Sequence, residues 1–105
     1  MLAEIKMSKV LTLKDITQTI KTLSDKYNIN NVYLFGSYAR KEATEESDLD
    51  LLVYGGKGFK LCMVYAFAEE VRQKLKKKVD AFEIHEINQE SSFYENIMKE
   101  KLLVA

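Results

Sequence analysis

A chain of 105 residues is long enough for one ordinary domain and too short for two. Its 47% hydrophobic and 30% charged residues exclude the composition of a disordered segment. Because 16 Lys and Arg residues balance 16 Asp and Glu residues, the zero net charge argues against a broad surface for binding nucleic acid.

The remaining composition limits the cellular setting. The single cysteine, Cys62, excludes an intramolecular disulfide and a cysteine-based zinc cluster. No apolar run approaches the ~18 residues that a membrane-spanning helix requires. Near the N-terminus, Glu4, Lys6 and Lys9 leave no apolar core for a signal peptide. We therefore expect a cytoplasmic protein without membrane contacts, formed by a single domain over residues 1–105.

The first half of the chain alternates between predicted helix and predicted strand. Apolar residues at helical spacing predict a helix over 13–27, and Thr12 to Asp15 resembles a capping box at its start. The apolar run 32–35 predicts a strand that ends before Gly36, followed by a polar connection with a short helix. Leucine and aspartate then alternate, which predicts a second strand over 48–54.

The second half continues the alternation. We expect a helix over 60–77, a third strand over 79–84, a helix over 93–100, and a closing apolar segment, 102–104, of open form. The apolar stripe of the 60–77 helix is expected to comprise Leu61, Val64, Tyr65, Ala68, Val71 and Leu75. This order of elements predicts an α/β (α+β) fold, in which helices pack on a small sheet.

The connection after the first predicted strand has the features of an anion site. A strand that ends at Gly-Ser and enters a helix leaves unpaired backbone N–H groups that can bind phosphate. Gly36 permits close approach of the backbone, Ser37 adds a hydroxyl donor, and Arg40 adds a cation one turn along. On its own, this pattern favours an ordinary turn.

Two aspartates favour a functional site over an ordinary turn. Asp48 and Asp50 project from one face of the predicted strand, with Cα atoms roughly 6.5–7 Å apart, so their carboxylates repel unless a divalent cation compensates. Asp80 would join them if its strand lies alongside, which gives a triad suited to Mg²⁺ ions that bridge a nucleoside triphosphate. Asp80 could also help to deprotonate an acceptor hydroxyl. The alternatives are a solvated strand start and a plain surface aspartate.

The two parts of this pattern together resemble a known signature. Residues 36–40 (Gly-Ser-Tyr-Ala-Arg) and 47–53 (Ser-Asp-Leu-Asp-Leu-Leu-Val) are similar to the Gly-Ser and Asp-x-Asp motifs of the polymerase β-like nucleotidyltransferase superfamily. The resemblance is strongest to the minimal nucleotidyltransferases, small proteins often paired with HEPN-domain toxins. One departure is Lys41, where relatives commonly have glycine, and it makes the end of the local helix less certain.

The resemblance implies a palm-like nucleotidyltransferase fold with a mixed sheet. It implies nucleotide binding by Gly36, Ser37 and Arg40, and a catalytic, metal-binding triad of Asp48, Asp50 and Asp80. The implied reaction moves a nucleoside monophosphate, AMP from ATP or the equivalent from another nucleoside triphosphate, to a hydroxyl group with the help of two Mg²⁺ ions. In toxin–antitoxin pairs that hydroxyl can be a tyrosine of the HEPN toxin.

Three functions stay open at this point. The chain has little beyond a catalytic core, so acceptor binding is expected to depend on a partner such as a HEPN toxin or on a homo-oligomer. The protein could instead neutralise its partner by contact alone, as a non-catalytic antitoxin. A transferase acting on a small molecule such as an antibiotic is the third alternative, although no acceptor pocket is evident in the sequence.

The zero net charge is the sum of opposed blocks. Residues 42–53 and 80–96 carry five acids each and no base, whereas residues 57–78 carry seven bases and two acids. The basic run Lys76–Lys78 is interpreted as a solvated helix C-terminus whose cations complement the helix dipole. Contact of this run with nucleic acid or an acidic partner is the alternative.

Overall fold

The computed structural model describes residues 10–105, so the N-terminal Glu4, Lys6 and Lys9 lie outside the described residues. In chain order the elements are α1 (Leu13–Lys26), β1 (Asn31–Phe35), η1 (Gly36–Tyr38), β2 (Leu49–Tyr54), α2 (Cys62–Leu75), β3 (Val79–Glu83), η2 (Ile84–Glu86), α3 (Ser92–Glu100) and β4 (Leu102–Leu103). The predicted alternation of helices and strands is confirmed. Within residues 10–105, none of these helices has the length and apolar character needed to cross a membrane.

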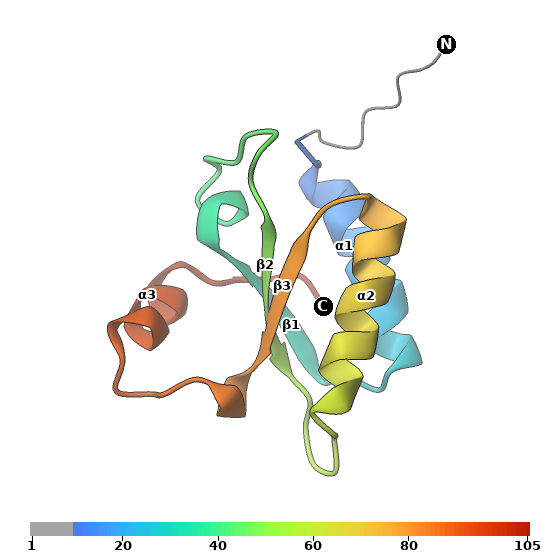
Figure 1. Cartoon of the computed structure of the whole chain (residues 1–105), viewed down its shortest axis with the longest axis vertical. Coiled ribbons are helices and arrows are strands. Elements are labelled where there is room, and N and C mark those ends of the chain that lie inside the picture. Colours follow the sequence, from blue (N-terminus) through green and yellow to red (C-terminus); the bar gives the residue numbers. More distant parts are fainter. Residues whose placement is uncertain (1–9) are drawn as a thin grey trace.

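The four strands form one mixed sheet in the order β3-β2-β1-β4 (Figure 1). β1 pairs antiparallel with both β2 and β4, whereas β2 and β3 run parallel and are joined by α2. The closing apolar segment, whose form the sequence left open, is thus a short edge strand. The sheet confirms the predicted α/β (α+β) class.

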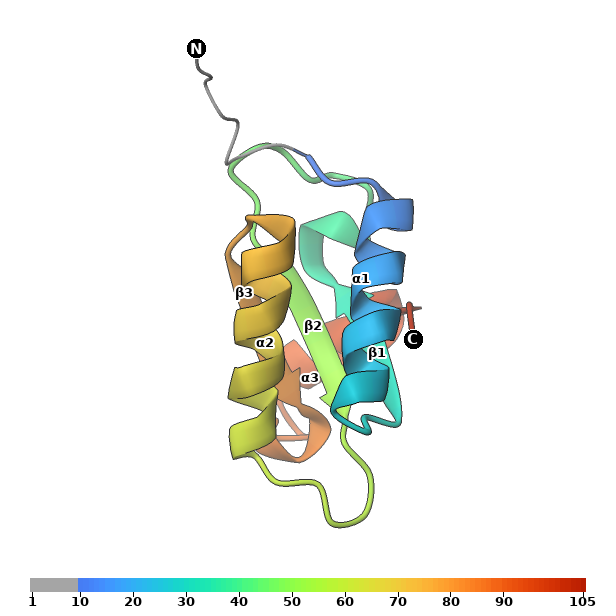
Figure 2. The ribbon, with the colours of Figure 1, turned by 90° about the vertical axis from the view of Figure 1, so that its right-hand side faces the viewer.

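Helices cover both faces of the sheet. α1 and α2 lie side by side on one face and α3 lies on the other (Figures 1 and 2). The larger core packs α1 and α2 against the sheet, and the smaller core, beneath α3, consists of Phe35, Leu52, Ile84, Ile87 and Ile97. Because both faces of β2 are covered, Leu51, Leu52 and Val53 are all fully buried.

The buried stripe of α2 differs from the predicted one. Val64, Phe67, Val71 and Leu75 are buried at spacings of three and four residues, as one face of a helix requires. Leu61 and Tyr65 were expected in this stripe, but they are 46% and 61% exposed. Leu61 precedes the first turn of α2, and Tyr65 lies on its solvent side.

Candidate active site

The three predicted carboxylates gather at one end of the sheet. Asp50 of β2 and Asp80 of β3 are Cα partners in the parallel register. Paired residues project from the same face, and Asp48 has the same parity as Asp50. This is the face of α3, because Leu52, two positions after Asp50, belongs to the core beneath that helix. The expectation that the strand of Asp80 lies beside that of Asp50 is confirmed.

The surroundings of Asp50 change its pKa strongly. Its partial burial, followed by the negative charges of Asp80 and Asp48, raises the pKa of Asp50 from 3.8 to about 6. The positive charge of Arg40 lowers the pKa of Asp50, but by less than burial and the two aspartates raise it. A divalent cation would relieve the repulsion, and a set of carboxylate oxygens suits a hard ion such as Mg²⁺.

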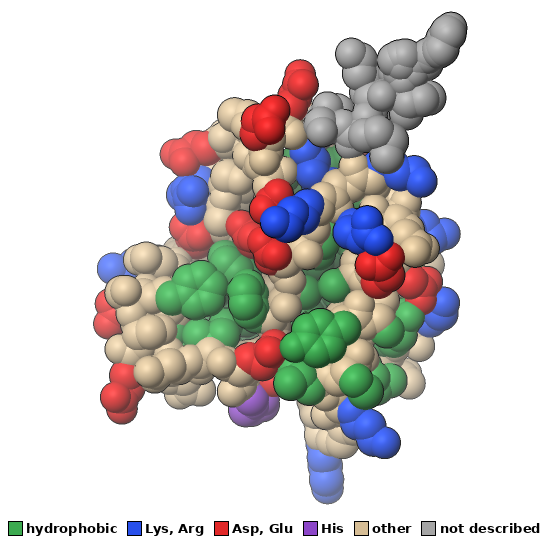
Figure 3. Space-filling view, in the orientation of Figure 1, with side chains coloured by type: hydrophobic (Ala, Val, Ile, Leu, Met, Phe, Trp, Pro, Cys, Tyr) green, Lys and Arg blue, Asp and Glu red, His purple; other side chains and the backbone are tan. Residues whose placement is uncertain are grey.

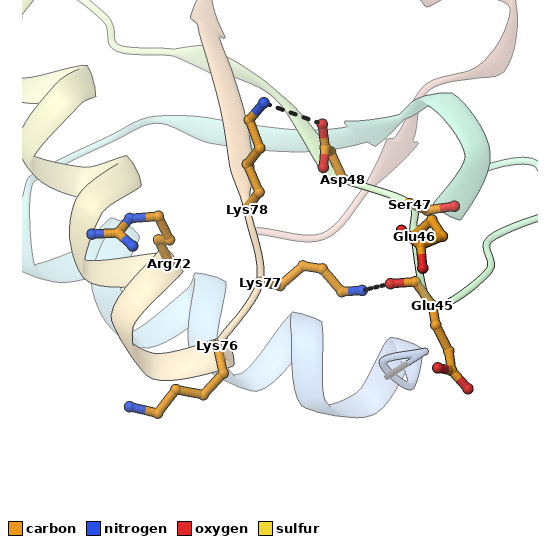
Figure 4. Close-up of a pocket in the computed structure, with 8 residues that line it drawn as sticks. All are labelled: Glu45, Glu46, Ser47, Asp48, Arg72, Lys76, Lys77 and Lys78. Atoms are coloured by element: carbon orange, nitrogen blue, oxygen red, sulfur yellow. Dashed lines mark hydrogen bonds and ion pairs between the residues drawn. The ribbon is translucent and has the colours of Figure 1, made fainter. Parts of the chain in front are cut away.

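The carboxylates share this region without converging on one point. Among residues 10–105, no three His, Cys, Asp or Glu side chains are arranged to hold one metal ion. Asp48 instead faces Lys78, whose Nζ lies 3.8 Å from Asp48 Oδ2 (Figure 4). The donor type and the mutual repulsion fit a divalent cation, and the assignment of Asp48, Asp50 and Asp80 as its ligands stays a prediction.

The turn after β1 lies beside these carboxylates, because Phe35 pairs with Asp50. Gly36 has a φ of +76°, and a Cβ on it would overlap Asp50 Oδ2, so glycine is required here on two grounds. The short helix expected after it is only the single 3-10 turn η1, which is too short to supply a helix dipole. Anion binding at this turn therefore depends on the Gly36 N–H, the Ser37 hydroxyl and Arg40.

The sequence did not identify Glu100, the last residue of α3, as part of this region. The Gly36 N–H donates to Glu100 Oε2 over 2.6 Å. Arg40 Nη1 donates to Glu100 Oε1 and Oε2 over 3.0 and 3.2 Å. The carboxylate of Glu100 thus accepts hydrogen bonds from two of the three groups that were predicted to bind phosphate, Gly36 and Arg40. A triphosphate would have to displace this carboxylate in order to bind them.

Replacing Glu100 with Gln is therefore expected to raise the affinity for a triphosphate by about tenfold, since charge-assisted hydrogen bonds contribute roughly 1.5–3 kcal/mol. Calorimetric titration with inorganic tripolyphosphate in Mg²⁺ measures this effect without involving the nucleoside. Glu95→Gln, an exposed position on the same helix, is the matched control for net charge. An unchanged or lower affinity of Glu100→Gln would show that Glu100 does not compete with phosphate.

A pocket of about 540 Å³ lies between the turn, Asp50 and α3. Its lining includes Gly36, Ser37 and Asp50 from the sheet side, and Phe93 and Glu100 from α3. Small-molecule pockets in proteins have volumes of roughly 300–1,000 Å³. The pocket thus brings together four of the predicted site residues, Gly36, Ser37, Arg40 and Asp50, with space for a nucleotide.

A second pocket, of about 450 Å³, borders Asp48 and shares no lining residue with the first (Figure 4). Arg72 and Lys76–Lys78 form its basic side, opposite an acidic loop. Lys77 is buried and its Nζ donates to the backbone oxygen of Glu45 over 3.0 Å, so it ties this loop to the start of β3. The interpretation of the basic run as fully solvated is therefore wrong for Lys77.

Known nucleotidyltransferases are similar in sequence to this chain. The family model described as "Polymerase beta, Nucleotidyltransferase" matches residues 17–105. A candidate protein adenylyltransferase of Methanocaldococcus jannaschii is 32% identical over 78 residues, which cover 74% of this chain and 84% of that protein. Two other candidate adenylyltransferases of the same organism match over only 46% and 49% of their own length, so the chain spans about half of these curated relatives.

Solved structures share the fold. A candidate minimal nucleotidyltransferase superposes with a TM-score of 0.73 at 26% identity, over 88% of this chain and 95% of that chain. A chain of the complex between the tri-AMPylated Shewanella oneidensis HEPN toxin and MNT antitoxin gives a TM-score of 0.68 at 16% identity, over 90% of this chain and 72% of that chain. The expectation of a nucleotidyltransferase fold is therefore confirmed.

Proposed function

The chain belongs to the polymerase β nucleotidyltransferase family, and on this premise we propose that it transfers AMP from ATP to a hydroxyl group of a partner protein. The observation that carries the proposal is the position of Asp48, Asp50 and Asp80 beside the Gly36 turn, in a region with a nucleotide-sized pocket. Related proteins are named as adenylyltransferases, which supports AMP as the transferred group.

Each residue of the site has a role in this reaction. The Gly36 N–H, the Ser37 hydroxyl and Arg40 bind the triphosphate once Glu100 has moved aside. Asp48, Asp50 and Asp80 hold the Mg²⁺ ions, two in this proposal, which when bound neutralise the phosphate charge and stabilise the attacking and leaving oxygens. The acceptor oxygen bonds to the α-phosphorus as the bond to pyrophosphate breaks, and Asp80 accepts the hydroxyl proton.

The acceptor in this proposal is a tyrosine of a HEPN-type toxin, which makes the protein an antitoxin. The AMPylated toxin in the solved complex supports this choice. The second pocket also supports an acceptor on another molecule, because it gives access to Asp48 from outside the nucleotide pocket. A homo-oligomer that completes the acceptor site is the alternative arrangement of partners.

The test is transfer of label from α-labelled ATP to the purified product of the neighbouring gene in the presence of Mg²⁺. Label on that protein, absent with EDTA and with the Asp48→Asn/Asp50→Asn double variant, is the expected result. If none of the four nucleoside triphosphates donates label although the two proteins bind each other, the catalytic proposal fails. Full rescue from toxicity by the double variant would then favour neutralisation by contact alone.

A further inference from the structure

One stripe of α3 faces the nucleotide-sized pocket. Phe93, Asn96, Ile97 and Glu100 line it, at the spacing of three and four residues that places side chains on one helix face. Ile97 is fully buried and anchors this face to the core. Phe93 is 43% exposed, although it is a large apolar residue and neighbours the core beneath α3. The exposed face of this ring has no role in the proposed chemistry described so far.

The ring of Phe93 packs edge-to-face against two other rings. Its centroid lies 5.8 Å from that of Phe35 and 5.6 Å from that of Phe82, with the planes 77° and 76° apart. Such edge-to-face contacts favour a defined ring geometry. Figure 3 shows an exposed hydrophobic patch on this side of the molecule, with acidic side chains directly next to it. Phe93 therefore presents an exposed aromatic surface that packs against two further rings.

The rings that contact Phe93 come from strands that lie beside or carry the carboxylates. Phe35 is the Cα partner of Asp50. Phe82 follows Asp80 by two positions on β3 and so projects from the same face. A group stacked on Phe93 would therefore lie on the same face of the sheet as the carboxylates.

The distance along α3 also matches a nucleotide. Glu100 marks the phosphate position, since its carboxylate accepts from the Gly36 N–H and from Arg40. Phe93 precedes Glu100 by two helical turns, about 10 Å along the axis, and Asn96 lies between them. This separation is comparable to that between the phosphates and the base of an extended nucleotide, with the ribose at the level of Asn96.

We propose that Phe93 is the platform on which the base of the bound nucleotide stacks, with α3 aligned along the nucleotide from phosphate to base. The inference rests on the proposed function and adds the residue that recognises the nucleoside. Stacking of a base on an aromatic side chain typically changes the affinity by about tenfold or more. The aromatic ring, and not its hydrophobic area alone, is what this role requires.

The test compares Mg²⁺-ATP with Mg²⁺-tripolyphosphate in calorimetric titrations of the whole chain. Phe93→Ala is expected to weaken ATP binding about tenfold and to leave tripolyphosphate binding unchanged, whereas Phe93→Tyr keeps the ATP affinity of the parent. Tyr65→Ala, at an exposed aromatic residue of α2 on the opposite face of the sheet, is the matched control. Circular dichroism checks that each variant is folded.

The outcomes separate the inference from the function on which it rests. Equal loss of ATP and tripolyphosphate binding in Phe93→Ala, or unchanged ATP binding, overturns the base platform. If the parent binds tripolyphosphate as tightly as ATP, the platform is also excluded, but the proposed triphosphate site stands. If the parent binds neither ligand, the proposed function itself is wrong.

Discussion

Replacing Asp50 with Asn is expected to reduce nucleotidyl transfer by about a thousandfold or more and, at the same time, to stabilise the fold. The loss of activity follows because Asp50 is a partly buried carboxylate of the proposed metal site, and a bound metal supplies several kcal/mol of transition-state stabilisation. The gain in stability follows because Asp50 is partly buried beside two other negative charges, Asp80 and Asp48.

The pKa of Asp50 gives the sign and the pH range of the stability effect. In the folded protein the pKa is about 6, compared with 3.8 for the free side chain, so the folded chain holds this proton more tightly than the unfolded chain. The free energy of unfolding therefore falls as the pH rises from about 4 to about 6, and stays low above that range. Asp50→Asn should remove this destabilisation and raise the free energy of unfolding by about 2 kcal/mol at pH 7. This is less than the energy that corresponds to the whole pKa shift, because the carboxyl group is partly exposed to solvent.

Thermal melts at pH 4.5 and 7.5, with and without Mg²⁺, measure this effect. The parent should lose stability between the two pH values in EDTA and recover it in Mg²⁺, whereas both changes should be clearly smaller in Asp50→Asn. Asp25→Asn, at an exposed position of α1, removes one negative charge without touching the site. A variant that is inactive but no more stable than the parent would contradict the electrostatic account.

Local patterns in the sequence predicted the features that depend on neighbouring residues. Thr12 Oγ1 accepts a hydrogen bond from the Asp15 N–H over 3.1 Å, as the N-terminal cap of α1 required. The alternation of leucine and aspartate also predicted that Asp48 and Asp50 share one face, whereas the position of Asp80 beside them depends on the parallel pairing of β2 with β3 and was predicted only on that condition. The first two features follow from helix and strand periodicity, which a single sequence displays directly.

Contacts between distant segments could not be predicted in the same way. Glu100 is 64 residues from Gly36, and no spacing rule links the end of α3 to a turn after β1. The pairing of Lys78 with Asp48 likewise depends on how β3 lies against β2.

Lys41, at a position where glycine was expected, adopts a φ of +62°, so the turn keeps a left-handed residue despite a cost of roughly 1 kcal/mol.

Replacing Gly36 with Ala is expected to weaken triphosphate binding by at least a hundredfold and to destabilise the protein by about 2–4 kcal/mol. Two effects combine at this position. The φ of +76° disfavours any residue with a Cβ, and that Cβ would also overlap the carboxylate of Asp50. Relief of the overlap must displace either the turn, whose N–H group is proposed to bind phosphate, or the carboxylate proposed to bind metal.

A second glycine separates these two effects. Gly58 has nearly the same conformation, with a φ of +78°, but a Cβ there would meet nothing within 4 Å. Gly58→Ala should therefore lower the free energy of unfolding by only the cost of placing a Cβ at a positive φ, roughly 1–2 kcal/mol. It should leave triphosphate binding intact. Tripolyphosphate titrations and thermal melts of the two variants measure the difference that the overlap makes.

The Asp50→Gly background provides the final control, because it removes the carboxylate that the new Cβ would meet. In that background Gly36→Ala should cost no more stability than Gly58→Ala, and the difference between the two backgrounds measures the interaction between Gly36 and Asp50. If Gly36→Ala costs the same with and without Asp50, close packing of the turn against the carboxylate does not explain the glycine. The turn and the carboxylates would then be independent parts of the site, which the register of Phe35 with Asp50 argues against.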